Sequence, residues 1–183
     1  MGEIERCIDD EIPFDVPESW AWARLGTVCN FGECENTEAS DIAPDAWLLD
    51  LEDIEKDTGR LLQRKRKSQV NSLSTKHCFS VGQILYSKLR PYLNKVIIAD
   101  ENGYCTSEIL PLNFSAAFTN YYAQVYLMSP FFVEYATQCS YGVKMPRLGT
   151  QDGRNALVPI PPICEQQRIV EQLDNILALR NRL

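Results

Sequence analysis

Short apolar runs separated by turn residues occupy the middle of the chain, a pattern typical of a domain built on strands. Residues 47–51 (WLLDL) form such a run between polar neighbours and predict a buried strand. The further runs that predict strands are 81–86, 95–99 and 104–112. Asn102-Gly103 predicts the turn before the last of them. Pro91 excludes a central strand between two of these runs and favours an extended backbone at Arg90.

Two stretches show helical spacing. Ser129-Pro130 predicts a helix start, because serine caps the free N–H groups and proline fits the first helical position. Its apolar positions follow one face, and Gly142 is placed to end it. A second helix follows the proline-rich segment 158–162. The apolar stripe that predicts it, and that could begin a coiled-coil seam, is Ile169, Val170, Leu173, Ile176 and Leu177.

The segments before and between these elements are polar. Residues 3–19 are acidic and contain two prolines, which predicts an extended lead-in, and residues 30–45 and 57–76 predict exposed loops. The 183 residues, with 45% apolar content, fit one domain with a real core. No stretch approaches the roughly 18 apolar residues of a membrane-spanning helix, and the acidic N-terminus is unlike a secretory signal.

Metal and catalytic chemistry find little support. The seven cysteines are scattered without a CxxC pair, so we expect reduced thiols in a cytoplasmic protein and no cofactor. Cys29/Cys34 and His77/Cys78 are the only short-range metal-ligand candidates, and a structural role is favoured for them. Glycine-rich nucleotide loops and hydrolase motifs are absent. The acids between 50 and 55 leave a nuclease possible by spacing, although a solvated edge is the simpler interpretation.

Charge is strongly segregated along the chain. Eighteen basic and 25 acidic residues give a net charge of −7. Residues 1–55 hold sixteen acids and two bases, whereas residues 56–95 hold ten bases and one acid, a local net charge of +9. Because salt screens charge beyond about 8–10 Å, such a block can attract DNA even on an acidic protein. The block could equally pair with the acidic N-terminal third, and charge alone does not decide between the two.

Five motifs, in order, are similar to one known family. Residues 12–26 contain IPF, PESW and LG, residues 85–95 read LYSKLRPYLNK, and residues 105–108 read CTSE. Residues 142–148 read GVKMPRL and residues 159–170 read PIPPICEQQRIV. Together they resemble the DNA specificity subunits of Type I restriction–modification systems. In residues 105–108 the family's serine and threonine are exchanged.

This resemblance implies a fold, a function and partners. The fold would be an α/β target recognition domain with a mixed, twisted sheet and flanking helices, followed by the start of a spacer helix. We expect a leader at 1–11, the recognition domain at 12–160 and the helix at 161–183. Such a subunit reads double-stranded DNA and positions methylation and restriction subunits without its own catalysis. A full subunit usually holds two recognition domains, so this chain would be a fragment or a half that pairs through its C-terminal helix.

The resemblance and the residue chemistry together indicate which side chains contact DNA. Arginine offers a planar fork for guanine or phosphate, and lysine serves as a point charge. The predicted contacts are Arg60, Arg64, Lys65, Arg66, Lys67, Ser87, Lys88, Arg90, Tyr92, Lys144 and Arg147. Of these, the run 64–67 and Arg60 would contact phosphates. Arg90 could read a base or contact a phosphate, or it could pair with an acidic neighbour instead. Glu108 could accept from cytosine or pair with an arginine.

The alternatives belong to other classes. One is a stand-alone DNA-modifying enzyme, a methyltransferase or nuclease fragment. A methyltransferase acting on exocyclic amines would carry an Asn/Asp-Pro-Pro-aromatic tetrad and a glycine-rich cofactor loop, and the sequence has neither. The other is a protein–protein module that uses only the C-terminal helix, which would leave the basic block unexplained.

Overall fold

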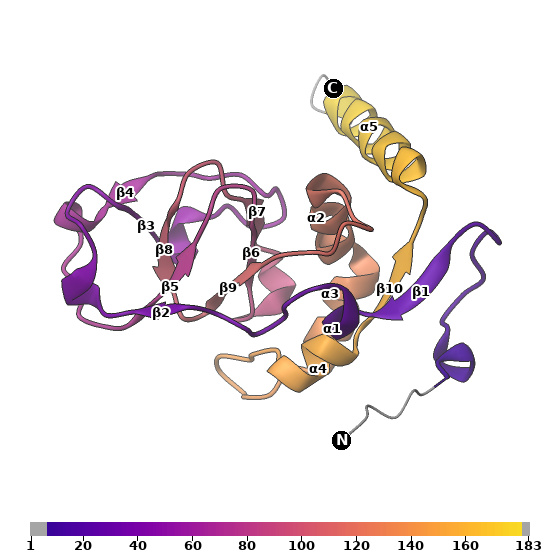
Figure 1. The fold of residues 1–183 in the computed structure, drawn as a ribbon, viewed down its shortest axis with the longest axis horizontal. Helices are drawn as coiled ribbons and strands as arrows, with labels where there is room; N and C mark the ends of the chain where they lie inside the picture. Colours follow the sequence, from indigo (N-terminus) through magenta and orange to yellow (C-terminus); the bar gives the residue numbers. More distant parts are fainter. Residues whose placement is uncertain (1–6, 181–183) are drawn as a thin grey trace.

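Three small sheets carry the β-structure of residues 7–180, the part of the chain that this computed structural model describes (Figure 1). The strand orders are β2-β5-β8-β3-β4, β7-β6-β9 and β1-β10. The strands are β1 (Ala21–Arg24), β2 (Asn36–Thr37), β3 (Trp47–Leu49), β4 (Lys65–Arg66), β5 (Lys76–Phe79), β6 (Ile84–Ser87), β7 (Val96–Ile98), β8 (Gly103–Thr106), β9 (Ile109–Leu112) and β10 (Leu157–Ile160).

The α/β class is confirmed, and the largest sheet is mixed: β3 runs parallel to β8, and the other three neighbouring pairs of strands are antiparallel. The expected strand at 104–112 is two strands in different sheets, because the chain turns at 107–108 between β8 and β9. The expected loop at 57–76 holds the short strand β4, and the loop at 30–45 holds β2.

The α-helices are α1 (Leu25–Val28), α2 (Asn120–Met128), α3 (Pro130–Gln138), α4 (Thr150–Asn155) and α5 (Ile163–Arg180). Single 3-10 turns occur at Asp9–Glu11, Ala39–Asp41, Leu51–Asp53, Lys67–Gln69 and Pro91–Leu93, the last labelled η5. The capped start of α3 is confirmed, since the Ser129 hydroxyl accepts from the Phe132 N–H. The helix stops at Gln138, so Gly142 lies beyond it in a loop.

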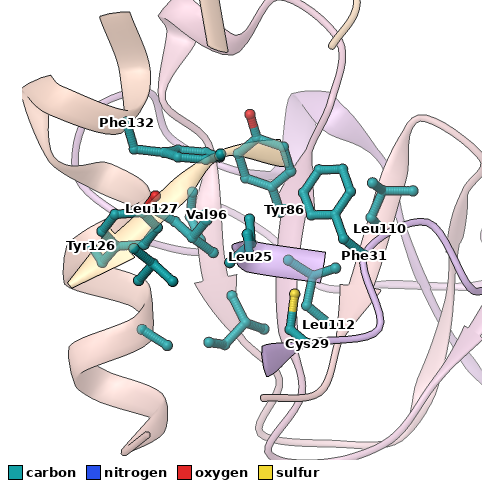
Figure 2. Packing of buried hydrophobic residues seen from close by; sticks show 14 of the residues in the cluster. Leu25, Cys29, Phe31, Tyr86, Val96, Leu110, Leu112, Tyr126, Leu127 and Phe132 are labelled. Carbon is teal, nitrogen blue, oxygen red and sulfur yellow. The ribbon is translucent and has the colours of Figure 1, made fainter. Parts of the chain in front are cut away.

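Strand β6 separates two hydrophobic cores. Ile84 and Tyr86 face the larger one, which α1, α2 and α3 cover, and Leu85 faces the smaller one beneath the five-stranded sheet. Because alternate residues of a strand point to opposite faces, a strand buried on both sides reads as an unbroken apolar run. Figure 2 shows Tyr86 in the larger core beside Phe132 and Phe31.

Helix α5 leaves the domain from a hydrogen-bonded joint. The fully buried Gln166 accepts from the Thr119 N–H at 2.8 Å and donates to the carbonyls of Ala117 at 2.7 Å and Pro161 at 2.9 Å. Ile169 and Val170 pack on the larger core. The rest of the helix extends away from the sheets (Figure 1).

Candidate nucleic-acid interface

The turn after β6 holds Arg90 in a left-handed conformation. Its φ of 50° and ψ of 63° contradict the extended backbone expected before a proline. Such a conformation costs a non-glycine residue about 1–2 kcal/mol, so its surroundings must impose it. The Arg90 N–H donates to the Pro146 carbonyl at 2.7 Å, and the Arg90 carbonyl accepts from the Leu93 N–H at 2.8 Å. These bonds turn the chain into η5, where Tyr92 is half exposed.

A second predicted segment lies directly beside this turn. Tyr141 and Arg147 exchange two backbone hydrogen bonds of 3.1 and 3.0 Å, which close a small hairpin over residues 141–147. Gly142 turns the chain in that hairpin with a φ of 99°. The N–H of Leu148 donates to the Lys88 carbonyl at 3.0 Å. The fold therefore brings together segments 88–92 and 144–147, which are some fifty residues apart in sequence.

Arg147 holds the hairpin to the sheet. Its guanidinium makes three hydrogen bonds to the Glu108 carboxylate at 2.8–3.0 Å and one to the Met145 carbonyl at 3.1 Å. The Glu108 hydrogen bond raises the pKa of Arg147. The Glu108 carbonyl also accepts from the Lys88 N–H at 3.0 Å. Of the two roles considered for Glu108, the structure shows pairing with an arginine.

Arg90, in contrast, has unused donor capacity. Its Nη2 reaches the Lys144 carbonyl at 3.4 Å, and its buried Nε lacks a hydrogen-bond partner among the described residues. Within residues 7–180, no carboxylate lies within ion-pairing distance of Lys88, Arg90 or Lys144. An unpaired buried donor is costly, and no carboxylate of the described residues neutralises the charge of this side chain.

The basic run is placed differently. Arg64 pairs with Asp100 and Glu101, and its guanidinium lies 4.2 Å from the centroid of the Trp47 ring. Lys65 pairs with Glu52 and, at 2.8 Å, with the fully buried Asp53. The hydrogen bonds that Lys65 donates to Asp53 and Glu52 raise the pKa of Lys65.

The neighbouring basic residues are also engaged. Arg66 pairs with Glu101, and Lys67 donates to the Ser72 carbonyl at 2.9 Å. Arg60 pairs with Glu55 at 3.0 Å but stays 69% exposed. Acidic partners thus compensate much of the positive charge that the sequence concentrates in this block.

Ser87 is withdrawn from any surface. It is 3% exposed, and its hydroxyl donates to the Leu89 carbonyl at 3.0 Å. Because β6 is buried on both faces, the strand's last residue points into the protein. In this conformation Ser87 offers DNA no contact, contrary to the expectation from sequence.

Exposed apolar side chains of the hairpin were not among the predicted contacts. Tyr141 is 63%, Val143 102% and Met145 44% exposed. The signal available in the sequence was three large apolar residues alternating with small or polar ones between Ser140 and Pro146. Alternation there also fits an ordinary strand, so it gave no reason to expect a displayed loop.

Other kinds of site find no support in the described part of the chain. Residues 7–180 contain no cluster of three or more histidine, cysteine or acidic side chains that could hold a metal ion. No helix in that range has the length and apolar character needed to cross a membrane. An open cleft of 1410 Å³ lies between the leader and α3, lined in part by Arg24, Tyr126 and Tyr135, and none of the predicted DNA contacts line it.

Comparison with solved structures identifies the class of fold. The HsdS subunit from Thermoanaerobacter tengcongensis superposes with a TM-score of 0.78 at 21% identity, over 94% of this chain and 45% of that one. A chain from a structure titled for complex assembly and conformational transition of the type I R-M system gives 0.76 at 21% identity, over 93% and 45%. The fold is therefore shared with a part of each of these two chains.

Sequence comparison then gives the family. Residues 17–183 match the family model described as the Type I restriction modification DNA specificity domain, and the chain belongs to this family. The specificity subunit of the Type I restriction enzyme EcoDI from Escherichia coli is 29% identical over 177 residues, which is 97% of this chain and 39% of that protein. The chain thus spans less than half the length of the relatives it matches.

Proposed function

We propose that this chain reads a sequence in double-stranded DNA as part of the specificity subunit of a Type I restriction–modification system. The observation that carries the proposal is Arg90. Its backbone is held in a costly conformation next to a second loop, and its guanidinium has a buried N–H without a partner. Strain and unpaired polar groups that the fold maintains are typical of binding sites.

The charges of the site support DNA as the ligand. Lys88, Arg90 and Lys144 have no acidic partner within residues 7–180. The half-exposed Tyr92 follows Arg90 by two positions. We infer that these four side chains contact the duplex directly. Arg147 acts through the hairpin that it holds in place, because Glu108 and Met145 occupy its guanidinium.

Phosphate contact by Arg60 and the 64–67 run is the less favoured part of the proposal. An arginine or lysine already paired with a carboxylate must break that pair, or share it, to neutralise a phosphate. Arg60 is the best candidate, since it is largely exposed and its single partner Glu55 is on the surface.

Equilibrium binding tests this function. The full chain, together with its partner subunits, is titrated with a fluorescent pool of mixed duplexes at several salt concentrations. We expect log K to fall by about 0.9 for each phosphate neutralised, with one sequence enriched over the pool. Binding that ignores salt, or that enriches no sequence, would contradict the proposal.

We further propose that the chain has no catalytic site and works with methylation and restriction subunits. The support is family membership. The purified chain should neither transfer methyl groups to DNA nor cut it until the partner subunits are added. Methylation or cleavage by the chain alone would instead favour the enzyme alternative. Because the ligand is genomic DNA, we place the protein in the cytoplasm.

Helix α5 is proposed as the contact to a second specificity half. Its first half covers the domain's own core through Ile169 and Val170, whereas Leu173, Ile176 and Leu177 are 36%, 62% and 44% exposed. We also propose a leader at 1–11, a recognition domain over 12–160 and a spacer helix over 161–183, of which residues 1–6 and 181–183 lie outside those that the structure describes. Replacing Ile176 by lysine should abolish association with the second half without lowering thermal stability, as followed by sedimentation.

A further inference from the structure

The hairpin 141–147 displays an apolar tip beside uncompensated cations. Val143 is fully exposed, and Lys144 and Met145 follow it. Single exposed apolar residues are common on proteins and need no explanation. Three of them in five residues, on one loop next to Arg90 and Lys88, are unusual.

The loop is also held more firmly than its exposure would suggest. The two backbone bonds between Tyr141 and Arg147 close it at its base. The Arg147–Glu108 pair anchors it to the turn just before β9, and the Arg90 guanidinium reaches the carbonyl of Lys144. A binding loop held in its bound shape loses little conformational entropy when the ligand arrives. The hairpin is therefore suited to insertion as a rigid unit.

The exposed apolar side chains of the hairpin indicate which surface of a DNA duplex it would contact. The major groove admits a two-stranded β-ribbon, and there the C5-methyl group of thymine is the apolar feature of the base edges. The phosphate backbone offers an apolar side chain nothing, whereas lysine and arginine favour it. An exposed valine followed by a lysine thus fits a thymine methyl at the base edge and a phosphate beside it.

We propose that the hairpin enters the major groove and that Val143 contacts the C5-methyl of a thymine, which makes Val143 a specificity-determining residue. The inference rests on the proposed function, since it names one base contact of that same site. In this arrangement Arg147 and Glu108 are positioning residues, because their ion pair fixes the hairpin relative to the sheet.

Thymine and deoxyuridine differ only by the C5-methyl group, so their exchange tests the contact directly. The full chain in its complex first selects its preferred duplex from a random pool. Each thymine of that duplex is then replaced by deoxyuridine, one at a time. For the unaltered protein, loss of one buried methyl contact should weaken binding about fourfold at one position. The variant Val143→Ala should bind the thymine and deoxyuridine duplexes equally at that position and keep its other base preferences.

Val81 offers a matched control. It is 61% exposed and lies in the turn that precedes β6, whereas Lys88 and Arg90 follow this strand. Val81→Ala should retain the full thymine–deoxyuridine difference. Both variants replace exposed side chains, so their thermal melts should match that of the unaltered protein. If the preferred duplex has no thymine whose methyl matters, or if Val143→Ala stays sensitive to the exchange, the inference is overturned while DNA recognition stands. Failure to select any duplex would instead contradict the proposed function itself.

Discussion

The guanidinium of Arg147 donates three hydrogen bonds of 2.8–3.0 Å to the carboxylate of Glu108, which lies 39 residues earlier in the chain. Arg147 also pairs through its backbone with both Tyr141 and Leu89. A single residue thus connects the hairpin, the turn after β6 and the start of β9. Its side chain serves the arrangement of the site, although its charge would suit DNA equally well.

Replacing Glu108 by glutamine should loosen this connection. The amide keeps the shape but loses the charge of a half-buried, forked ion pair, so we expect about 1 kcal/mol of lost stability. For a domain of this size the melting temperature should fall by about 2–4 °C. DNA affinity should fall about fivefold if the same energy is lost from positioning the hairpin. Glu134→Gln, at an exposed site on α3, is the control, and an equal effect of both would contradict the prediction.

Substitutions of Arg90 and Lys65 should have different effects, the first on DNA recognition and the second on the stability of the fold. Arg90→Ala should relax the preference at one base position and weaken the selected duplex by about 1–3 kcal/mol, as measured by competition binding. Lys65→Ala should change base preference little. It removes the partner of the fully buried Asp53, which retains a hydrogen bond of 2.8 Å from Gln63, so about 2 kcal/mol of stability should be lost. If Lys65→Ala weakens all duplexes at unchanged stability, Lys65 contacts phosphate instead.

Acid should release the arginines of the basic run. Hydrogen bonds from Arg66 and Arg64 lower the pKa of Glu101 below its ordinary value of 4.5. Because the folded-state pKa is the lower one, the stabilisation is complete above pH 4.5 and is lost as pH falls through the folded-state pKa. Glu101→Gln should therefore melt at a lower temperature than the unaltered protein at pH 7, and the difference should shrink as the pH falls below 4.5. A difference independent of pH would show that the charge of Glu101 is not responsible.

Gln166 should be essential to the joint of α5. Gln166→Leu leaves the Thr119 N–H and the carbonyls of Ala117 and Pro161 without their partner in a buried site. Unsatisfied buried groups of this kind cost about 2–4 kcal/mol in sum, or about 5–15 °C in melting temperature. Amide hydrogen exchange in the first turns of α5 should accelerate. Gln167→Leu, at the exposed neighbouring position, should change neither the melting temperature nor the amide exchange. Equal melting temperatures for the two variants would contradict the role given to Gln166.

Helix α2 shows where local pattern was insufficient for the fold. Its sequence is rich in tyrosine and ends in Leu-Met, so its apolar residues surround the helix without forming one stripe. Tyr122 and Tyr126 are buried because their hydroxyls donate to the carbonyls of Pro159 and Leu157 in β10. Those partners lie more than thirty residues away, and no window of sequence could reveal them.

The sequence by itself determined the apolar runs that form β3 and β6, the capped start of α3, the stripe of α5 and the family to which the chain belongs. Each of these is written in residues that are neighbours along the chain. Only the tertiary structure decided which cations face outward. It paired Arg64 and Arg66 with acids near residue 100, forced Arg90 into a left-handed turn against Pro146, and set the hairpin beside it. Ion pairs and backbone bonds between distant segments depend on how the sheets pack, because their energies exist only once the core has brought the partners together.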